Sequence, residues 1–85
     1  MQDRKKLILL ALAKTLKKFR NNKSLFTFSS ENDISISIVS TIERGLKDPQ
    51  LTTLFKIAEA LNISLSEFIK EIEKNLPKDF SLIEK

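Results

Sequence analysis

Glycine and proline are scarce in this chain, which contains one Gly and two Pro in 85 residues. A β-rich protein of this size needs several tight turns, and tight turns favour Gly, Asn and Asp. The scarcity therefore predicts a mostly helical chain with short connections. A length of 85 residues is enough for one domain with one modest hydrophobic core.

Composition argues against several classes of function. The chain has no Cys and no His, so it lacks a thiolate nucleophile, the commonest general base and the commonest metal ligands. We therefore expect no enzyme activity and no metal, cofactor or small-molecule ligand. No apolar run is long enough to cross a membrane. The basic residues 4–6 precede the apolar residues 7–13 as in a signal peptide, but lysines continue a helical pattern and no cleavage site follows. We expect a cytoplasmic protein.

Apolar residues spaced three and four apart predict five helices. They span about residues 3–21, 24–31, 35–45, 51–61 and 64–76. Serines suited to N-caps stand at the start of the second, third and fifth helices, at Ser24, Ser35 and Ser64. Gly45 suits the position after the third helix, and Pro77 stops the fifth.

The third helix has a competing interpretation. Residues 34–38 alternate Ile and Ser with a period of two, and the β-branched isoleucines favour a strand. Ser35 as an N-cap candidate before this helix and Gly45 after it favour a helix. We therefore expect a helix.

The stretch from Ser24 to Leu65 resembles the Cro/CI-type helix-turn-helix of the Xre family of repressors. The resemblance rests on Ile-Ser at 34–35, Ile-Glu-Arg-Gly at 42–45, Pro49, and Ile-Ala-Glu-Ala-Leu at 57–61. It implies an all-α, compact five-helix bundle of the phage-repressor DNA-binding type, whose second and third helices form the helix-turn-helix. Residues 1–76 would be the DNA-binding domain, and residues 77–85 a tail that packs on it or on a dimer partner.

The resemblance also implies sequence-specific binding of double-stranded DNA by a small transcriptional regulator, such as a repressor, a restriction–modification controller or an antitoxin. The third helix would lie in the major groove. Its base-reading candidates are Ser35, Ile36, Ser37, Ser40 and Thr41. Hydroxyls bind any base edge and discriminate weakly, whereas Ile36 can only pack against thymine methyl groups. Ser35 has a second interpretation as a plain N-cap.

Phosphate contacts are expected at the start of the second helix and after the third. The candidates are the backbone of Ser24, Leu25 and Phe26 and the side chains of Arg44 and Lys47. The family usually has Gln where Leu25 stands, so that side-chain contact is lost. Residues 1–23 carry eight Lys/Arg and one Asp, a net charge of +7, whereas residues 24–85 carry −3. The basic first helix is either a phosphate-attracting surface or a solvated face.

Two departures from the family pattern concern the first turns. Asp33 occupies a position often filled by Gly, and the link between the first two helices is about two residues shorter than usual. Arg20 then falls where the family has an Arg that pairs with the Glu of the third helix, here Glu43. The alternative is that Arg20 is a solvated surface charge.

The family also implies a homodimer on a palindromic operator, because one helix-turn-helix reads only a few base pairs. Apolar residues of the fifth helix and the tail exceed what a small core needs. The candidates for dimer or tail packing are Ile72, Leu76, Phe80, Leu82 and Ile83. A frayed tail is the alternative.

A second function is compatible with the same fold. Four apolar residues stand where DNA-reading surfaces usually carry polar ones: Leu25, Phe26, Ile36 and Ile38. Exposed apolar patches often mark protein contacts. The alternative to DNA binding is therefore a protein-interaction module.

Overall fold

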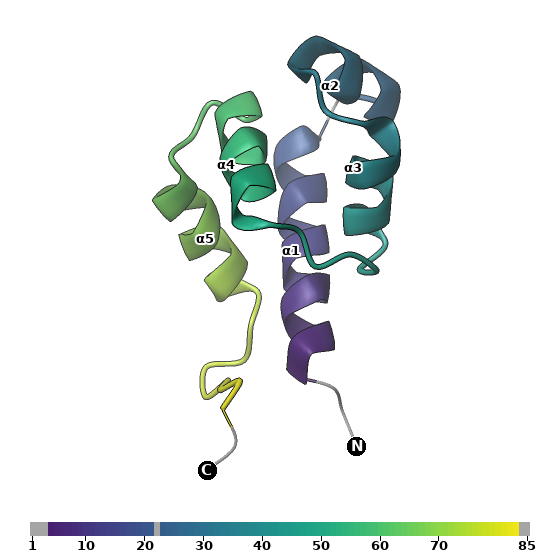
Figure 1. Cartoon of the computed structure of the whole chain (residues 1–85). Coiled ribbons are helices and arrows are strands. Elements are labelled where there is room, and N and C mark those ends of the chain that lie inside the picture. Colours follow the sequence, from purple (N-terminus) through teal and green to yellow (C-terminus); the bar gives the residue numbers. More distant parts are fainter. Residues whose placement is uncertain (1–3, 22, 84–85) are drawn as a thin grey trace.

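The computed structural model describes residues 4–21 and 23–83. They form five α-helices (Figure 1): α1 (Arg4–Arg20), α2 (Leu25–Asn32), α3 (Ile36–Glu43), α4 (Leu51–Ala60) and α5 (Leu65–Lys74). None of these residues is in a strand. Within the ambiguous segment, residues 36–38 are helical as expected, and residues 34–35 precede the helix. The predicted helix start at Asp3, the turn residue Asn22 and the last two tail residues lie outside the described residues.

The longest helix, α1, organises the fold. It packs against α3 on one side and α5 on the other, while α2 packs on α3 and α4 packs on α5. Figure 1 shows α2 at the end of the bundle that is distant from both chain ends. The extents of the molecule are 43 × 23 × 23 Å.

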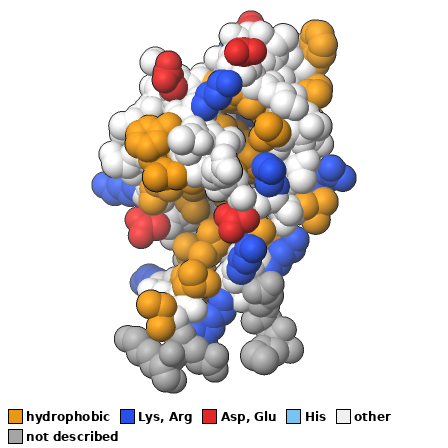
Figure 2. Space-filling view, in the orientation of Figure 1, with side chains coloured by type: hydrophobic (Ala, Val, Ile, Leu, Met, Phe, Trp, Pro, Cys, Tyr) orange, Lys and Arg blue, Asp and Glu red, His pale blue; other side chains and the backbone are white. Residues whose placement is uncertain are grey.

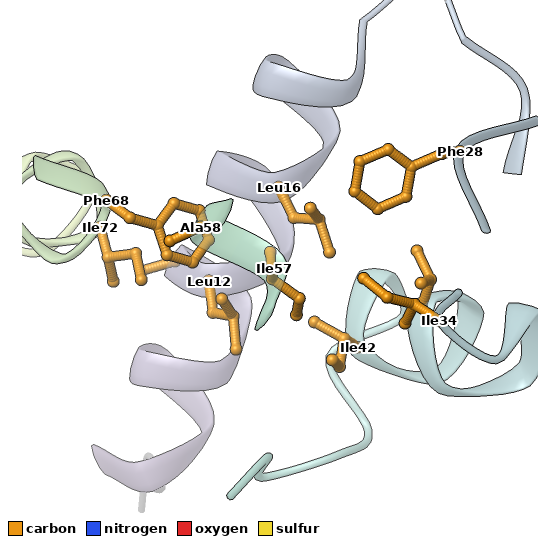
Figure 3. Packing of buried hydrophobic residues seen from close by; sticks show 11 residues of the cluster. Leu12, Leu16, Phe28, Ile34, Ile42, Ile57, Ala58, Phe68 and Ile72 are labelled. Atoms are coloured by element: carbon orange, nitrogen blue, oxygen red, sulfur yellow. The ribbon is translucent and has the colours of Figure 1, made fainter. Parts of the chain in front are cut away.

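Each of the five helices contributes buried side chains to the hydrophobic core. Leu9, Leu12 and Leu16 of α1 are buried as the helical spacing predicted, and Phe19 is partly buried. Figure 3 shows large core side chains around α1: Leu12, Leu16, Phe28, Ile34, Ile42, Ile57, Phe68 and Ile72. The rings of Phe19 and Phe68 meet edge to face, with centroids 6.2 Å apart. Helices of eight residues such as α2 and α3 are unstable alone, so this core determines how they are held.

The predicted N-caps behave differently from one another. The Ser24 hydroxyl accepts a hydrogen bond from the Thr27 N–H at 3.0 Å, and the Ser64 hydroxyl accepts one from the Glu67 N–H at 3.1 Å. Ser35 occupies the N-cap position of α3 but makes no capping hydrogen bond with its side chain.

Residues with a positive φ follow four of the helices, beginning with Asn21 after α1, whose φ is 43°. Asp33 follows α2 with φ 53°, and Asn62 follows α4 with φ 62°. After α3, Gly45 has φ 71° and donates its N–H to the Ile42 carbonyl at 2.9 Å. Asp and Asn tolerate this conformation and Gly adopts it freely. The turn after α2 therefore forms without the glycine usual in the family.

Two apolar residues differ from expectation. Ile72, predicted for dimer or tail packing, belongs to the core. Because α5 packs against both α1 and α4, its apolar face is covered within one molecule. Leu51, whose spacing of three residues from Leu54 predicts a place on the apolar face of α4, is exposed. The sequence also predicted that α5 extends to residue 76, whereas it ends at Lys74 with Asn75 as its C-cap.

Candidate DNA-binding surface

The α2–α3 pair is fixed by its buried side. Phe28 of α2, Ile34 of the turn, and Val39 and Ile42 of α3 are all buried in the core. Ile38, one of the four apolar residues noted on the DNA-reading surface, is partly buried and packs against the same core. The opposite side of α3 is left facing outward.

The structure places the five predicted base-reading residues on this outward side. Ser35, Ile36 and Ser37 are exposed, and Ser40 and Thr41 are partly exposed one turn later. Ile36 keeps 45 % of its surface exposed. The first turn and a half of α3 therefore presents four hydroxyls and one aliphatic side chain to a ligand.

Three of these hydroxyls already have partners within the protein. The Ser35 and Ser37 hydroxyl oxygens lie 3.2 Å apart and share a hydrogen bond. The Thr41 hydroxyl donates to the Ser37 carbonyl one turn earlier. These bonds use two of the hydroxyl protons that direct base readout would employ.

The predicted phosphate-contacting residues lie at the two ends of the α2–α3 pair. Ser24 caps the N-terminus of α2, where backbone N–H groups suit an anion. Next to it, Leu25 packs against the core, whereas Phe26 is 70 % exposed. Beyond α3, Arg44 is exposed and Lys47 is partly exposed.

Arg20 and Glu43 form the predicted pair. Arg20 Nε and Nη2 donate to the Glu43 carboxylate at 2.6 and 2.7 Å. The Glu43 side chain is 5 % exposed and that of Arg20 is 17 % exposed. The hydrogen bonds to Glu43 raise the pKa of Arg20 above its ordinary value, although burial opposes the shift. The pair joins the last residue of α1 to the last residue of α3.

Comparisons with known proteins support this arrangement. A family model described as a helix-turn-helix matches residues 28–68. The chain is 36 % identical over 61 residues to the control protein C.MunI of Mycoplasma sp, which covers 72 % of this chain and 82 % of that protein. The chain belongs to the Cro/CI-type helix-turn-helix family.

Two further similarities agree with this assignment. The plasmid copy control protein CopR of Streptococcus agalactiae is 43 % identical over 56 residues, which cover 66 % of this chain and 61 % of that protein. The crystal structure of the clp gene regulator ClgR from C. glutamicum has the same fold, with a TM-score of 0.73 and 24 % identity. That match covers 82 % of this chain and 92 % of the other. The chain is a DNA-binding transcriptional regulator of the Cro/CI-type family.

In this family member, the start of α1 also holds the segment that follows α3. Lys6 Nζ donates to the Gly45 carbonyl at 2.7 Å, and Lys5 Nζ lies 3.7 Å from the Asp48 carboxylate. Arg4 Nη1 donates to the Ser81 carbonyl in the tail at 3.1 Å. Sequence reasoning missed these contacts because a run of cations resembles a solvated face. The one available signal was Gly45, since carbonyls at a helix C-terminus attract cations.

A second missed group joins α1 to α5. Asn75 Nδ2 donates to the Thr15 hydroxyl at 2.8 Å, and that buried hydroxyl donates to the Ala11 carbonyl at 2.8 Å. Glu71 accepts a hydrogen bond from Lys74 at 2.8 Å and lies 3.9 Å from Lys18. The bond from Lys74 is the main reason why the pKa of Glu71 falls below its ordinary value.

Other kinds of site receive no support in the part of the chain that the structure describes. Residues 4–21 and 23–83 contain no group of three or more acidic side chains placed to hold a metal ion. No helix within these ranges is both long and apolar enough to span a membrane.

Proposed function

We propose that this regulator binds a palindromic operator as a homodimer, with α3 of each protomer in the major groove of one half-site. The observation that carries the proposal is the outward side of α3. It is free of core contacts, and the buried Arg20–Glu43 pair holds the helix against α1. Two such helices would read half-sites about one helical turn apart.

Within each half-site we assign base contacts to Ser35, Ile36, Ser37, Ser40 and Thr41. We assign phosphate contacts to the N-terminus of α2, formed by Ser24, Leu25 and Phe26, and to Arg44 and Lys47. Support comes from the exposure of the base-contact residues on α3 and from the position of the others at the two ends of the α2–α3 pair. Neutralised phosphates release counterions, so affinity would fall steeply as salt rises.

The dimer is supported by apolar side chains that one protomer leaves uncovered. Figure 2 shows hydrophobic side chains on the surface where α4 and α5 lie, on the left of this face. The exposed apolar residues of α4 and the tail are Leu51, Phe55, Leu82 and Ile83. Leu76 and Phe80 are partly buried. We propose that a second copy covers part of this surface, with residues 77–83 contributing.

The names control protein and plasmid copy control protein fit a repressor, a restriction–modification controller or an antitoxin-type regulator. A transcriptional regulator acts in the compartment that contains the DNA, so we propose the cytoplasmic location expected from the sequence.

The direct test is selection from a random duplex library with the purified protein at a stated salt concentration. We expect an enriched inverted repeat with half-site centres about 10 base pairs apart. Sedimentation equilibrium of the free protein should show a dimer. Enrichment of no sequence, or binding that does not weaken as salt rises, would contradict the proposal.

A protein-interaction module is the alternative, and the exposure of Phe26 favours it. A large apolar side chain in that position is unusual on a surface that faces phosphates. The same selection separates the two functions, because a protein-binding module would retain no duplex at physiological salt.

A further inference from the structure

Ile36 is the first residue of α3 and is 45 % exposed. It is absent from the apolar residues that pack on the core, whereas Ile38, two residues later, is among them. In a docked helix-turn-helix, the N-terminal residues of the recognition helix contact base edges. Ile36 therefore lies where bases are read and has no structural task in the core.

The chemistry of Ile36 restricts what it can contact. Base edges in the major groove present hydrogen-bond donors, acceptors and one apolar group, the C5-methyl of thymine. An aliphatic side chain placed against a donor or an acceptor would strip it of water and return no hydrogen bond, which is unfavourable. Contact with a methyl group is the favourable outcome.

The neighbouring hydroxyls contribute little discrimination by comparison. Ser35 and Ser37 share one hydrogen bond, and Thr41 donates its proton to the Ser37 carbonyl. The oxygen atoms still accept hydrogen bonds, but hydroxyls suit many base edges. Base preference at the start of α3 therefore depends mainly on the aliphatic residue.

We propose that Ile36 is a specificity-determining residue that recognises the C5-methyl group of a pyrimidine in each half-site. This inference rests on the DNA binding proposed above. The methyl group stands at the same ring position in thymine and in 5-methylcytosine, and uracil and cytosine lack it. Cytosine methylation at this position would therefore strengthen binding, and loss of the thymine methyl would weaken it.

The test uses the selected operator, with each thymine replaced in turn by deoxyuridine, which removes only the methyl group. At the sensitive position, four duplexes carry T·A, U·A, C·G or 5-methylcytosine·G. We expect about fourfold weaker binding for U than for T, and about fourfold stronger binding for 5-methylcytosine than for C. Both ratios should stay constant as salt changes, because no counterion is involved.

Two variants assign the effect to Ile36. Ile36→Ala should bring both ratios close to one, and Ile36→Val should give intermediate ratios. As a matched control, Phe26→Ala removes another exposed apolar side chain and should affect all four duplexes alike. The side chain of Ile36 lies outside the core, so circular dichroism should show the same helicity for both Ile36 variants.

Three outcomes would overturn the inference and can be told apart. Equal binding of T and U at every position would show that no methyl group is read. A methyl effect that survives in Ile36→Ala would assign the readout to another residue. Failure to enrich any duplex would appear before any base is replaced, and would remove the proposed function together with this inference.

Discussion

Arg20 and Glu43 join the C-terminal ends of α1 and α3 through two parallel hydrogen bonds of 2.6 and 2.7 Å. Glu43 is almost completely buried, where an unpaired carboxylate would be strongly destabilising, and the Arg20 guanidinium compensates its negative charge. Since α3 has only eight residues, its orientation depends on such tertiary contacts. The pair therefore couples the stability of the fold to the orientation of the base-reading helix.

Removing the guanidinium should be costly because it leaves a buried carboxylate without a partner. We expect Arg20→Met to lower the free energy of unfolding by about 3 kcal/mol, measured by urea denaturation at pH 7. Glu43→Gln serves as the comparison, and the double variant should lose less than the sum of the two single losses. A loss below about 1 kcal/mol for Arg20→Met would show that the pair behaves as a surface ion pair.

Acid should weaken the interactions that Glu71 of α5 makes with neighbouring cations, chiefly Lys74. The Lys74 hydrogen bond lowers the pKa of Glu71 from its ordinary value of 4.5. A carboxyl whose pKa is lower in the folded state adds stability above its unfolded pKa and loses it as pH falls through the folded value. Urea midpoints at pH 7 and pH 3 should therefore differ less for Glu71→Gln than for the wild type. Glu73→Gln, on the same helix, is the control and should keep the wild-type difference.

Gly45 is constrained both by its left-handed backbone conformation and by the space beside its Cα. Its φ is 71°, and a Cβ built there would lie 2.9 Å from Leu10 Cδ2. Gly45→Ala should destabilise the fold by about 1–2 kcal/mol from backbone strain alone, with the steric clash added. Thermal denaturation of Gly45→Ala and of Gly45→Ala with Leu10→Ala separates the two terms. If alanine at residue 45 left the melting temperature unchanged, the left-handed turn after α3 would be in doubt.

Lys47 and Thr41 should affect binding in different ways. Lys47→Ala should weaken binding to all sequences about equally and reduce the slope of log affinity against log salt by about one. Lys70→Ala, on α5, removes the same charge away from α3 and should leave the slope unchanged. Thr41→Ala should instead alter base preference at one or two positions, by less than Ile36→Ala does. A change of preference in Lys47→Ala would show that α3 docks differently.

Truncation after Leu76 tests the tail. It removes the partly buried Phe80, the exposed Leu82 and Ile83, and the bond from Arg4 to Ser81. We expect a shift from dimer to monomer in sedimentation equilibrium and weaker binding to the full operator. Arg4→Ala is the milder comparison, since it removes one hydrogen bond and leaves the apolar residues in place. Unchanged dimerisation, stability and affinity would leave the tail without the proposed role.

Helix positions and turns were predictable because each is decided by local chemistry. Ser24 and Ser64 cap their helices, and Asp33, Gly45 and Asn62 adopt left-handed conformations that few other residues tolerate. Arg20 with Glu43 was predictable only through the family resemblance, because 23 residues separate them.

Contacts that depend on packing angles were not predictable. The periodicity of α5 shows that Ile72 is apolar but not whether α1 or a second copy covers it. Thr15 likewise appears as an ordinary polar residue until Asn75, 60 residues later, is seen to donate to it. In α4, Leu51 continues the apolar spacing, but it is the first residue of the helix and is exposed.

The contacts of residues 4–6 also set rules for engineering. In the first turn of α1, Arg4, Lys5 and Lys6 contact Ser81, Asp48 and Gly45, respectively. The loop after α3 and the tail are therefore both held by the start of α1. Figure 1 shows that the start of α1 and the described tail residues after α5 lie at this end of the molecule. A reporter domain fused before residue 4 or after residue 83 would stand close to the loop that carries Lys47. A small dye on an exposed side chain would therefore disturb this loop less than a fused domain.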